Sequence, residues 1–381
     1  MIMKKVANIV FNPFTNDSRV LKESVSLARY GYEVEVIAHG DSGLAKEEVV
    51  NGIKVSRLSF LDRKITRSKA GKFKAYILWL AAVIKAVKSF DVLHCNDLTA
   101  LPIGVIVKKF YNHNVKLVYD AHEYETQMHS LNRLTKPIAK AVEKMLIPYA
   151  DRVITVSESI ADEYKKLYPM IEKPAVVLNA PPYTEIETKD LFRKKFNIRQ
   201  EHTIFLYQGM LGTGRGIELI LDAFKQINRD DAVIVFMGYG TYEEEIRKIS
   251  EAYPQIYFHE AVSPDVLLDY TSSADIGIHM AQSHCLSYYY ALPNKILEYI
   301  MAELPILVTR LPEMAKVVEQ YNIGKIIPEN SVASLKKSIN DILEDAIDKN
   351  NIQEAKKIYN WENQEKILLN VYKGLTDADK I

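Results

Sequence analysis

Residues 203–224, TIFLYQGMLGTGRGIELILDAF, predict a strand, a glycine-rich turn and a helix in direct succession. The first seven residues are mostly apolar, as in a strand that is buried on both faces of a parallel sheet. The helix is expected at Ile217–Phe224, directly after the glycines. In doubly wound sheets, ligands bind just beyond the carboxyl ends of the strands, so this turn is a candidate binding segment.

The same alternation of strands and helices recurs along the chain. Strands are expected at 6–11, 33–38, 91–96, 116–121, 152–157 and 175–180, and then at 203–209, 232–238, 255–260, 276–280 and 305–309. Two such sets predict an α/β protein with two doubly wound, Rossmann-like domains and a binding cleft between them. The proline-containing segment 178–187 marks the seam, and a helix expected at 360–375 could pack on either half.

The composition excludes several classes of protein. The 381 residues include 49 basic and 49 acidic ones, so no basic excess supports nucleic-acid binding. Cys95 and Cys285 are the only cysteines, which indicates a reducing, cytoplasmic compartment and no disulfide framework or zinc site. No stretch reaches the roughly 20 apolar residues that span a bilayer, so we expect a soluble protein or one that lies on a membrane.

The segment Gly209–Gly216 suits a phosphate group. Gly209, Gly212 and Gly214 let backbone N–H groups approach an anion, and the following helix N-terminus favours negative charge. Arg215 can bridge two phosphate oxygens. The segment matches neither the P-loop nor the dinucleotide fingerprint, which argues against an ATPase or a dehydrogenase. The alternative is a plain glycine-rich turn with a solvent-exposed arginine.

Residues 291–299, ALPNKILEY, predict the start of another helix at Pro293 and Asn294. Lys295 and Glu298 are three residues apart and therefore share one face of its first turns. There the lysine could face a phosphate and the glutamate could accept hydrogen bonds from a ribose diol. The alternative is an ion pair on the surface of the helix.

Two segments of the first half end predicted strands. In Tyr119–Tyr124, YDAHEY, the side chains of Asp120, His122 and Glu123 suit contacts to sugar hydroxyls or proton handling, or else a capped turn with a hydrogen-bonded histidine. In Asn12–Arg19, NPFTNDSR, Asp17 or Ser18 is the expected helix N-cap. A cation at position 19 opposes the helix dipole, so we expect an anion near Arg19.

Residues 63–88 carry about eight basic side chains and no acidic one around the apolar run AYILWLAAVI, which contains Tyr76 and Trp79. A basic segment with aromatic residues at its boundary is typical of a membrane-surface contact. Alternatively, it is a core helix that follows a basic loop.

Taken together, these motifs resemble glycosyltransferase family 4, whose members are retaining enzymes of the GT-B fold. The resemblance covers nearly the whole chain and is most specific at 292–309. Its blocks are NDSRVLKESVSLARYGYEVEVIA (16–38), DVLHCND (91–97), YDAHE (119–123), ADRVITVSE (150–158), VLNAPP (177–182), YQGMLGTGRGIELILDAF (207–224), FMGYG (236–240), SPDVLLDYTSSADIGI (263–278) and LPNKILEYIMAELPILVT (292–309).

The resemblance implies a role for each matching residue. Arg215 and Lys295 would neutralise the donor diphosphate, Glu298 would hold the donor ribose, and His122 would lie near the donor sugar. The glycines 209, 212 and 214 and residues Pro293 and Asn294 would contact the phosphates, and the backbone at Glu260, Ala261 and Val262 would frame the base. Acceptor-side residues would be Asp17, Arg19, Asp97 and Glu123.

The resemblance also implies the organisation of the chain and its partners. The final helix would return to the first domain, which gives an acceptor-side domain at 1–180 plus 361–381 and a donor domain at 183–360. The co-substrate would be a nucleotide-diphosphate sugar, used without a cofactor or metal. The acceptor would be a saccharide or a lipid-linked saccharide, as in surface-polysaccharide assembly, with peripheral contact to the inner membrane face through 63–88.

Two positions depart from the family pattern. Position 290, eight residues before Glu298, carries Tyr290 where the family usually has the first glutamate of a pair, a change shared by an LPNK-type branch. Met210 replaces the arginine that usually follows the glycine of the phosphate loop. These departures motivate an alternative, a degenerate GT-B protein that acts as a non-catalytic partner subunit.

Overall fold

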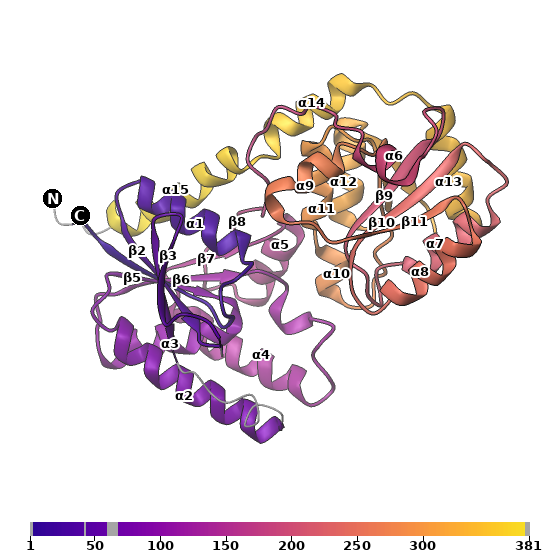
Figure 1. Ribbon diagram of the computed structural model, residues 1–381. Coiled ribbons are helices and arrows are strands. Elements are labelled where there is room, and N and C mark those ends of the chain that lie inside the picture. Colours follow the sequence, from indigo (N-terminus) through magenta and orange to yellow (C-terminus); the bar gives the residue numbers. More distant parts are fainter. Residues whose placement is uncertain (1–2, 42, 59–67, 378–381) are drawn as a thin grey trace. The chain divides into compact units, whose positions relative to one another are not determined.

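The computed structural model describes residues 3–41, 43–58 and 68–377 (Figure 1). The chain divides into two compact units. Unit 1 consists of Met1–Asn179 with Glu365–Ile381, and unit 2 consists of Ala180–Gln364. Each unit is a sheet with helices packed on it, as expected when buried parallel strands alternate with helices.

Unit 1 contains an eight-stranded sheet with the order β3-β4-β2-β1-β5-β6-β7-β8. All its neighbouring strands are parallel except β3 and β4, which form an antiparallel hairpin. The strands are β1 (Lys5–Ile9), β2 (Glu33–His39), β3 (Glu47–Val50), β4 (Ile53–Leu58), β5 (Val92–Asn96), β6 (Lys116–Ala121), β7 (Arg152–Thr155) and β8 (Ala175–Val176). The expectation of purely parallel sheets is therefore wrong at this edge, and the sequence patterns missed both β3 and β4.

The helices of unit 1 cover both faces of this sheet, α1 and α15 on one face and α2, α3 and α4 on the other (Figure 1). This division follows from right-handed crossovers. The chain moves one way across the sheet from β1 to β2 and the opposite way from β4 through β5 and β6 to β7, so the connecting helices must lie on opposite faces. The helices are α1 (Ser18–Arg29), α2 (Lys69–Val87), α3 (Asp97–Phe110), α4 (Thr135–Leu146), α5 (Glu158–Leu167) and α15 (Trp361–Asp377), with short 3-10 turns η2 (Glu125–Gln127) and η3 (Ile147–Tyr149).

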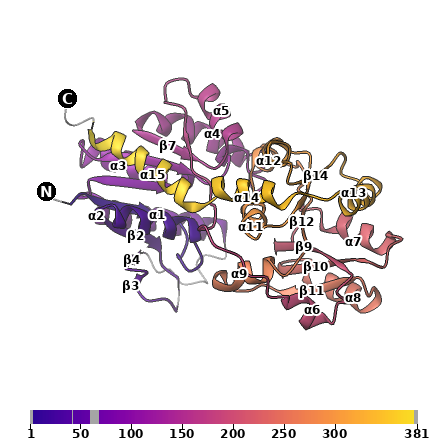
Figure 2. The ribbon, with the colours of Figure 1, turned by 90° about the horizontal axis from the view of Figure 1, so that it is seen from above.

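Unit 2 contains a six-stranded sheet with the order β11-β10-β9-β12-β13-β14, parallel throughout. Its strands are β9 (Thr203–Met210), β10 (Ala232–Tyr239), β11 (Ile256–Glu260), β12 (Ile276–His279), β13 (Ile306–Thr309) and β14 (Gly324–Ile327), the last of which was not predicted. The helices are α6 (Leu191–Phe196), α7 (Ile217–Gln226), α8 (Glu243–Ala252), α9 (Pro264–Thr271), α10 (Leu286–Tyr290), α11 (Asn294–Met301), α12 (Pro312–Tyr321), α13 (Val332–Glu344) and α14 (Lys349–Ile358). Helix α8 packs on β10 and β11 (Figure 2).

The strand order of each sheet reverses at one place, and the candidate residues follow the strands there. In unit 1, β1 lies between β2 and β5, and the segments after β1, β5 and β6 carry Arg19, Asp97 and His122. In unit 2, β9 lies between β10 and β12, and Gly209 lies at the end of β9. These are the places where doubly wound sheets bind ligands.

Candidate active site

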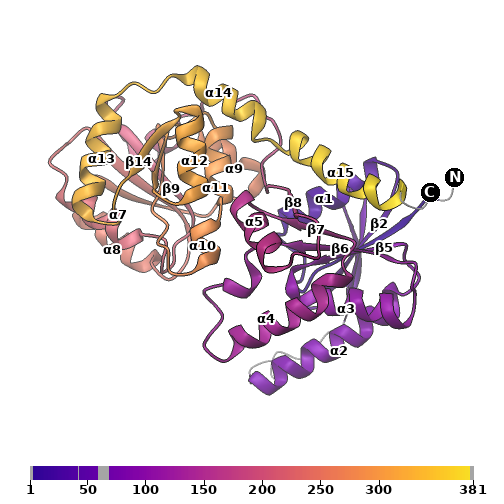
Figure 3. The same ribbon diagram turned by 180° about the vertical axis from the view of Figure 1, so that it is seen from behind.

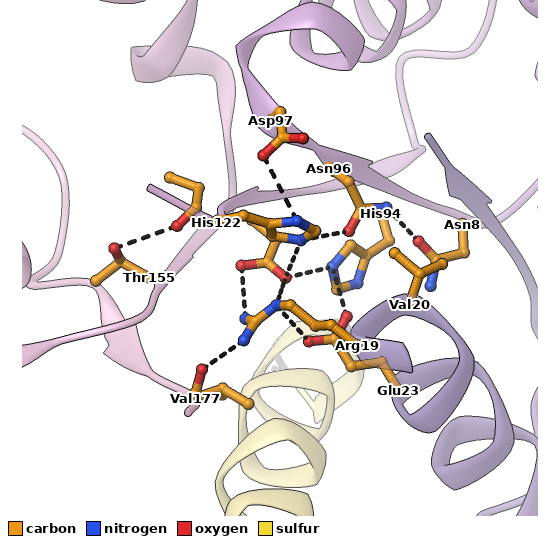
Figure 4. A network of polar contacts seen from close by, with 12 residues as sticks. Asn8, Arg19, Val20, Glu23, His94, Asn96, Asp97, His122, Thr155 and Val177 are labelled. Atoms are coloured by element: carbon orange, nitrogen blue, oxygen red, sulfur yellow. Dashed lines mark hydrogen bonds and ion pairs between the residues drawn. The ribbon is translucent and has the colours of Figure 1, made fainter. Parts of the chain in front are cut away.

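Arg19, in the first turn of α1, is the centre of a buried ion-pair network in unit 1 (Figure 4). Its guanidinium donates to both carboxylate oxygens of Asp120, with Nε–Oδ2 and Nη2–Oδ1 distances of 3.0 and 2.8 Å. Nε also lies 3.1 Å from Oε1 of Glu23, one helical turn further on, and Nη1 donates to the backbone oxygen of Val177. The anion expected near Arg19 is therefore present, and it consists of the protein's own carboxylates.

His122 lies at the more open edge of this network, with its side chain 19% exposed. Its Nε2 lies 3.2 Å from Oδ2 of Asp120 and 3.0 Å from Oδ1 of Asn96, and its Nδ1 lies 3.6 Å from Oδ1 of Asp97. Burial lowers the pKa of His122, but Asp97 and Asp120 outweigh burial and raise the pKa to about 10. Near neutral pH the ring is therefore an imidazolium, which can donate hydrogen bonds but cannot accept a proton.

Three buried members complete the network. Asp120 belongs to the YDAHEY motif that the sequence singled out, whereas Glu23 and His94 were not identified as site residues from the sequence. Burial would raise the pKa of Asp120, but Arg19 and His122 outweigh it and hold that pKa well below its usual range. Burial raises the pKa of Glu23 to about 7, against the opposing charge of Arg19. His94 has its Nε2 3.6 Å from Oε2 of Glu23 and 3.5 Å from Oδ2 of Asp120. The spacing of Arg19 and Glu23 along α1 was the only local signal of this arrangement.

Glu23, His94 and Asp120 are also the one group of the described residues whose ligand atoms lie close enough together to hold a metal ion. The Arg19 guanidinium contacts both carboxylates of this group. A cation is thus already in place, and the arrangement serves as a buried support for His122.

The other acceptor-side candidates differ in what their side chains do. Asp17 is the N-cap of α1, where one carboxylate oxygen accepts from the Val20 amide at 3.1 Å and the other from Nδ2 of Asn12 at 2.8 Å. The expected cap is therefore confirmed, and it occupies both oxygens of Asp17. Asp97 begins α3 with a φ of 61°, a strained conformation for a residue other than glycine. Asp97 and Glu123 flank His122 at the ends of β5 and β6, and both are partly exposed.

Lys295, the second residue of α11, is buried in unit 2 with only 7% of its surface exposed. Its Nζ lies 3.8 Å from the centre of the Tyr207 ring and has no hydrogen-bond partner among the residues that the structure describes. Gly209 has a φ of +102°, and a Cβ there would lie 3.6 Å from this amine, so bare backbone borders Lys295. Burial, and then Arg215, lowers the pKa of Lys295 well below its usual range, against the attraction of Glu298.

Two further basic side chains accompany Lys295. Arg215 is half-buried in the turn between β9 and α7, with its guanidinium carbon 5.8 Å from the centre of the Tyr288 ring. His279 ends β12, and its buried Nδ1 has no hydrogen-bond partner in the described part of the chain. Burial, followed by the charges of Lys295 and Arg215, lowers the pKa of His279 far below its usual value. Sequence patterns did not reveal His279.

No carboxylate of the described residues forms an ion pair with Lys295 or Arg215. Glu298 instead accepts a hydrogen bond from Nε2 of Gln208 at 2.5 Å, and Oε1 of Gln208 in turn accepts from Oγ1 of Thr271 at 2.8 Å. The alternative of a surface ion pair between Lys295 and Glu298 is therefore wrong, because Lys295 lies inside the unit. We name Lys295, Arg215 and His279 the basic cluster.

The remaining donor-side candidates also lie at the carboxyl ends of the strands of the unit 2 sheet. Gly209, Gly238 and Glu260 are register partners at the ends of β9, β10 and β11. Glu260 is exposed and pairs with Arg247 and Lys195 at 3.1 and 3.7 Å, while Ala261 and Val262 follow it directly.

The turn glycines and the start of α11 complete this edge. Within the turn, a Cβ at Gly214 would lie 2.9 Å from the His284 ring, whereas one at Gly212 would lie at an ordinary contact distance of 3.7 Å from the Met210 side chain. Pro293 is the N-cap of α11 and Asn294 its first, exposed residue, as predicted.

The two positions that depart from the family pattern, Met210 and Tyr290, carry neutral side chains. Each precedes a member of the basic cluster, Arg215 and Lys295 respectively, by five residues along the chain. Met210 ends β9 and is 47% exposed. Tyr290 ends α10, and its ring packs against that of Tyr289 at a centroid distance of 5.0 Å. Neither side chain can supply a positive charge, so Arg215 and Lys295 are the side chains here that can pair with a bound anion, which would favour the protonated form of Lys295.

The basic segment 63–88 is described only from residue 68 on, and its first part lies outside the described residues. Within α2, Trp79 is fully buried, and Tyr76 donates from its hydroxyl to the backbone oxygen of Thr99. The interpretation of Trp79 as an aromatic residue at a membrane boundary is therefore wrong. Among the described residues, no helix has the length and apolarity to cross a membrane.

Comparisons with known proteins agree with this architecture. The model of the family "Glycosyltransferase Family 4" matches residues 19–180, and that of "Glycosyl transferases group 1" matches residues 188–359. An uncharacterized glycosyltransferase of Methanocaldococcus jannaschii is 26% identical over 366 residues, which cover 91% of each chain.

Solved structures show the same fold. Sucrose-phosphate synthase from Thermosynechococcus elongatus superposes with a TM-score of 0.80 at 18% identity, covering 99% of this chain and 100% of that one. Anabaena HepE in complex with UDP-glucose superposes with a TM-score of 0.74 at 15% identity, covering 97% and 99%. With one family model on each unit and this fold throughout, the chain belongs to the glycosyltransferases of the GT-B fold.

Proposed function

We propose that this glycosyltransferase takes a sugar from a nucleotide-diphosphate donor bound to unit 2 and transfers it, with retention of configuration and without a metal, to an acceptor bound to unit 1. The acceptor is a saccharide or a lipid-linked saccharide, as in the assembly of surface polysaccharides or glycoconjugates. HepE, which shares the fold, is solved with UDP-glucose, which supports a nucleotide-sugar donor.

The observation that carries the proposal is the state of Lys295. A buried amine without a hydrogen-bond partner costs free energy in the unliganded protein. It lies one residue into a helix, where backbone N–H groups point outward and the helix dipole favours an anion. Bare backbone at Gly209 lets a phosphate oxygen approach the same place. A diphosphate would satisfy all of these groups together.

The chemistry follows from the charges. When the bond between the anomeric carbon and the diphosphate breaks, negative charge grows on the leaving oxygens. Lys295, Arg215 and the N-termini of α7 and α11 are fixed in place before the reaction, so they can stabilise this charge without reorganising. Glu298, oriented by Gln208, would accept hydrogen bonds from the ribose hydroxyls.

On unit 1, the His122 imidazolium would donate a hydrogen bond to a sugar hydroxyl near the reacting bond. Asp97 and Asp120 maintain its charge, and the ion pairs of Arg19 hold Asp120 in position. Asp97 and Glu123 would contact acceptor hydroxyls. Because Tyr290 replaces a glutamate, donor-sugar contacts must come from other groups, as expected of the LPNK-type branch.

The test is a thermal-shift panel of uridine, guanosine, thymidine and adenosine diphosphates with EDTA present. A ligand that binds only the folded state raises the melting temperature by mass action. We expect a shift with one nucleotide that is lost in Arg215→Ala and kept in Arg199→Ala, an exposed arginine of the same unit that precedes β9 at the opposite end of the strand. If no nucleotide shifts the wild type, or if both variants respond alike, the proposed diphosphate site is wrong and a non-catalytic partner becomes the better description.

A further inference from the structure

Helix α4 of unit 1 buries a charged side chain. Its one fully buried residue is Glu143, whose Oε1 accepts from the hydroxyls of Tyr119 and Tyr164 at 2.8 and 2.7 Å, and whose Oε2 accepts from Tyr168 at 2.8 Å. Burial raises the pKa of Glu143, and these three hydrogen bonds oppose that rise. The helix is thus fixed to β6 and α5 by a polar anchor, beside the partly buried apolar residues Ala139, Val142 and Leu146.

Four apolar residues of this segment point outward. Leu134 is 79% exposed, Ile138 63% and Met145 65%, and Ala141 is exposed as well. Their spacing of four, three and four residues places them in one stripe along the helix. An exposed apolar stripe of this kind marks an interaction surface in a soluble protein.

Basic side chains follow the same stripe. Arg133, Lys136, Lys140 and Lys144 recur at three- and four-residue spacing, and Glu143, which faces inward, is the only acidic residue between 131 and 149. An apolar stripe with a basic border and no exposed acid is complementary to an anionic, apolar surface.

Helix α2 extends this surface. Helix α3 contacts both α2 and α4, and the three helices cover one face of the sheet (Figure 3). On α2, Phe73, Ile77 and Leu78 are 67%, 44% and 43% exposed, next to the exposed Lys72 and Lys74. Two helices of one layer therefore combine exposed apolar and basic side chains.

We propose that α4, assisted by the first half of α2, docks unit 1 on an anionic lipid surface, with Ile138 and Met145 in the acyl boundary and the lysines at the headgroups. The charge pattern selects a lipid surface over a second copy of this chain, because two such basic stripes would repel each other. The inference rests on the proposed function for the lipid-linked acceptor. It places the main docking helix at 135–146, and only the assisting helix α2 lies within the segment 63–88.

The experiment is co-sedimentation of the full chain with vesicles of phosphatidylcholine, with and without phosphatidylglycerol. We expect binding to the anionic vesicles that weakens with salt. Lys140→Gln with Lys144→Gln should weaken it about 25-fold, at about fivefold for each charge near the surface. Ile138→Ser with Met145→Ser should weaken it roughly tenfold or more.

Matched pairs of exposed residues serve as controls, Lys248→Gln with Lys316→Gln and Ile358→Ser with Met170→Ser, and should leave binding unchanged. Equal binding of the α4 variants and their controls would overturn the proposal. So would a wild-type dimer, seen by light scattering, that dissociates in the Ile138→Ser, Met145→Ser variant, since a second copy would then cover the stripe. The nucleotide-dependent thermal shift is measured on the same samples, so a failure of donor binding is seen separately from a failure of docking.

Discussion

Replacing Lys295 with methionine should stabilise the protein and weaken donor binding at the same time. Methionine has a similar length and no amine, so Lys295→Met removes a buried group that lacks a hydrogen-bond partner and keeps the packing on Tyr207. An unsatisfied buried polar group costs about 1–3 kcal/mol. We therefore expect the free energy of unfolding of unit 2 to rise by an amount in that range.

The size of both effects can be worked out from the site. For a unit of this size, 1 kcal/mol corresponds to roughly 2–4 °C in melting temperature, so the variant should melt roughly 2–12 °C higher. A hydrogen bond to a charged group contributes about 1.5–3 kcal/mol, so the affinity for the nucleoside diphosphate should fall about 10- to 150-fold. If Lys295 served only to pack against its neighbours, Lys295→Met would lower the melting temperature instead of raising it.

Differential scanning calorimetry of the unliganded protein and isothermal titration with the nucleotide found in the panel measure the two effects. Lys316→Met, an exposed lysine on α12, is the control and should change both quantities little. A lower melting temperature for Lys295→Met, or an unchanged affinity, would refute the assignment of this amine to the diphosphate.

Three further predictions concern charges. Arg19→Met leaves Asp120 and Glu23 buried without their cation and should destabilise unit 1 by about 3–5 kcal/mol in urea unfolding; a loss below 1 kcal/mol would show that the ion pairs contribute little. The folded-state pKa of His122 is raised to about 10, so its contribution to stability is complete below about pH 6.5 and is lost as the pH rises toward 10. His122→Gln should remove that part of the slope of unfolding free energy against pH, and an unchanged slope would contradict the imidazolium. Burial lowers the pKa of unliganded Lys295 and a bound diphosphate raises it again, so in the pH range between these two pKa values nucleotide binding should take up protons and weaken as the pH rises; titrations in buffers of different ionisation enthalpy should show this uptake for the wild type and not for Lys295→Met.

The alternation of buried strands with helices predicted both sheets, since a continuous apolar run is a strong local signal. The strands β3 and β14 were missed because they have four residues each and lie at sheet edges. Strand β4, between β3 and β2, was missed because Lys54, Ser56 and Arg57 interrupt its apolar residues. One signal for the hairpin was present. Asn51 and Gly52 both have positive φ, and Asn-Gly is the preferred pair for a two-residue hairpin turn.

The candidate site was predictable where its chemistry is local. The Asp17 cap and the start of α11 depend on neighbours within a few residues, and both were found. The partners of Arg19 and His94 were not, because Asp120 is 101 residues from Arg19 and Tyr372 is 278 residues from His94. The sequence indicated that Arg19 needed an anion, but only the fold determines which one.

The two candidate sites, around His122 and around Lys295, treat their buried cations in opposite ways, and this difference bears on where a diphosphate binds. In unit 1 the cations Arg19 and His122 face carboxylates of the protein, and Asp97 and Asp120 accordingly raise the pKa of His122. In unit 2 the basic cluster has no carboxylate in ion-pair contact among the described residues, and the pKa values of Lys295 and His279 are lowered by burial and by neighbouring cations. An incoming anion would have to displace Asp120 or Asp97 in unit 1. In unit 2 it would instead pair with basic side chains that have no carboxylate partner among the described residues. The same electrostatics therefore favour the neutral hydroxyls of an acceptor beside His122 and the anionic leaving group of a donor beside Lys295.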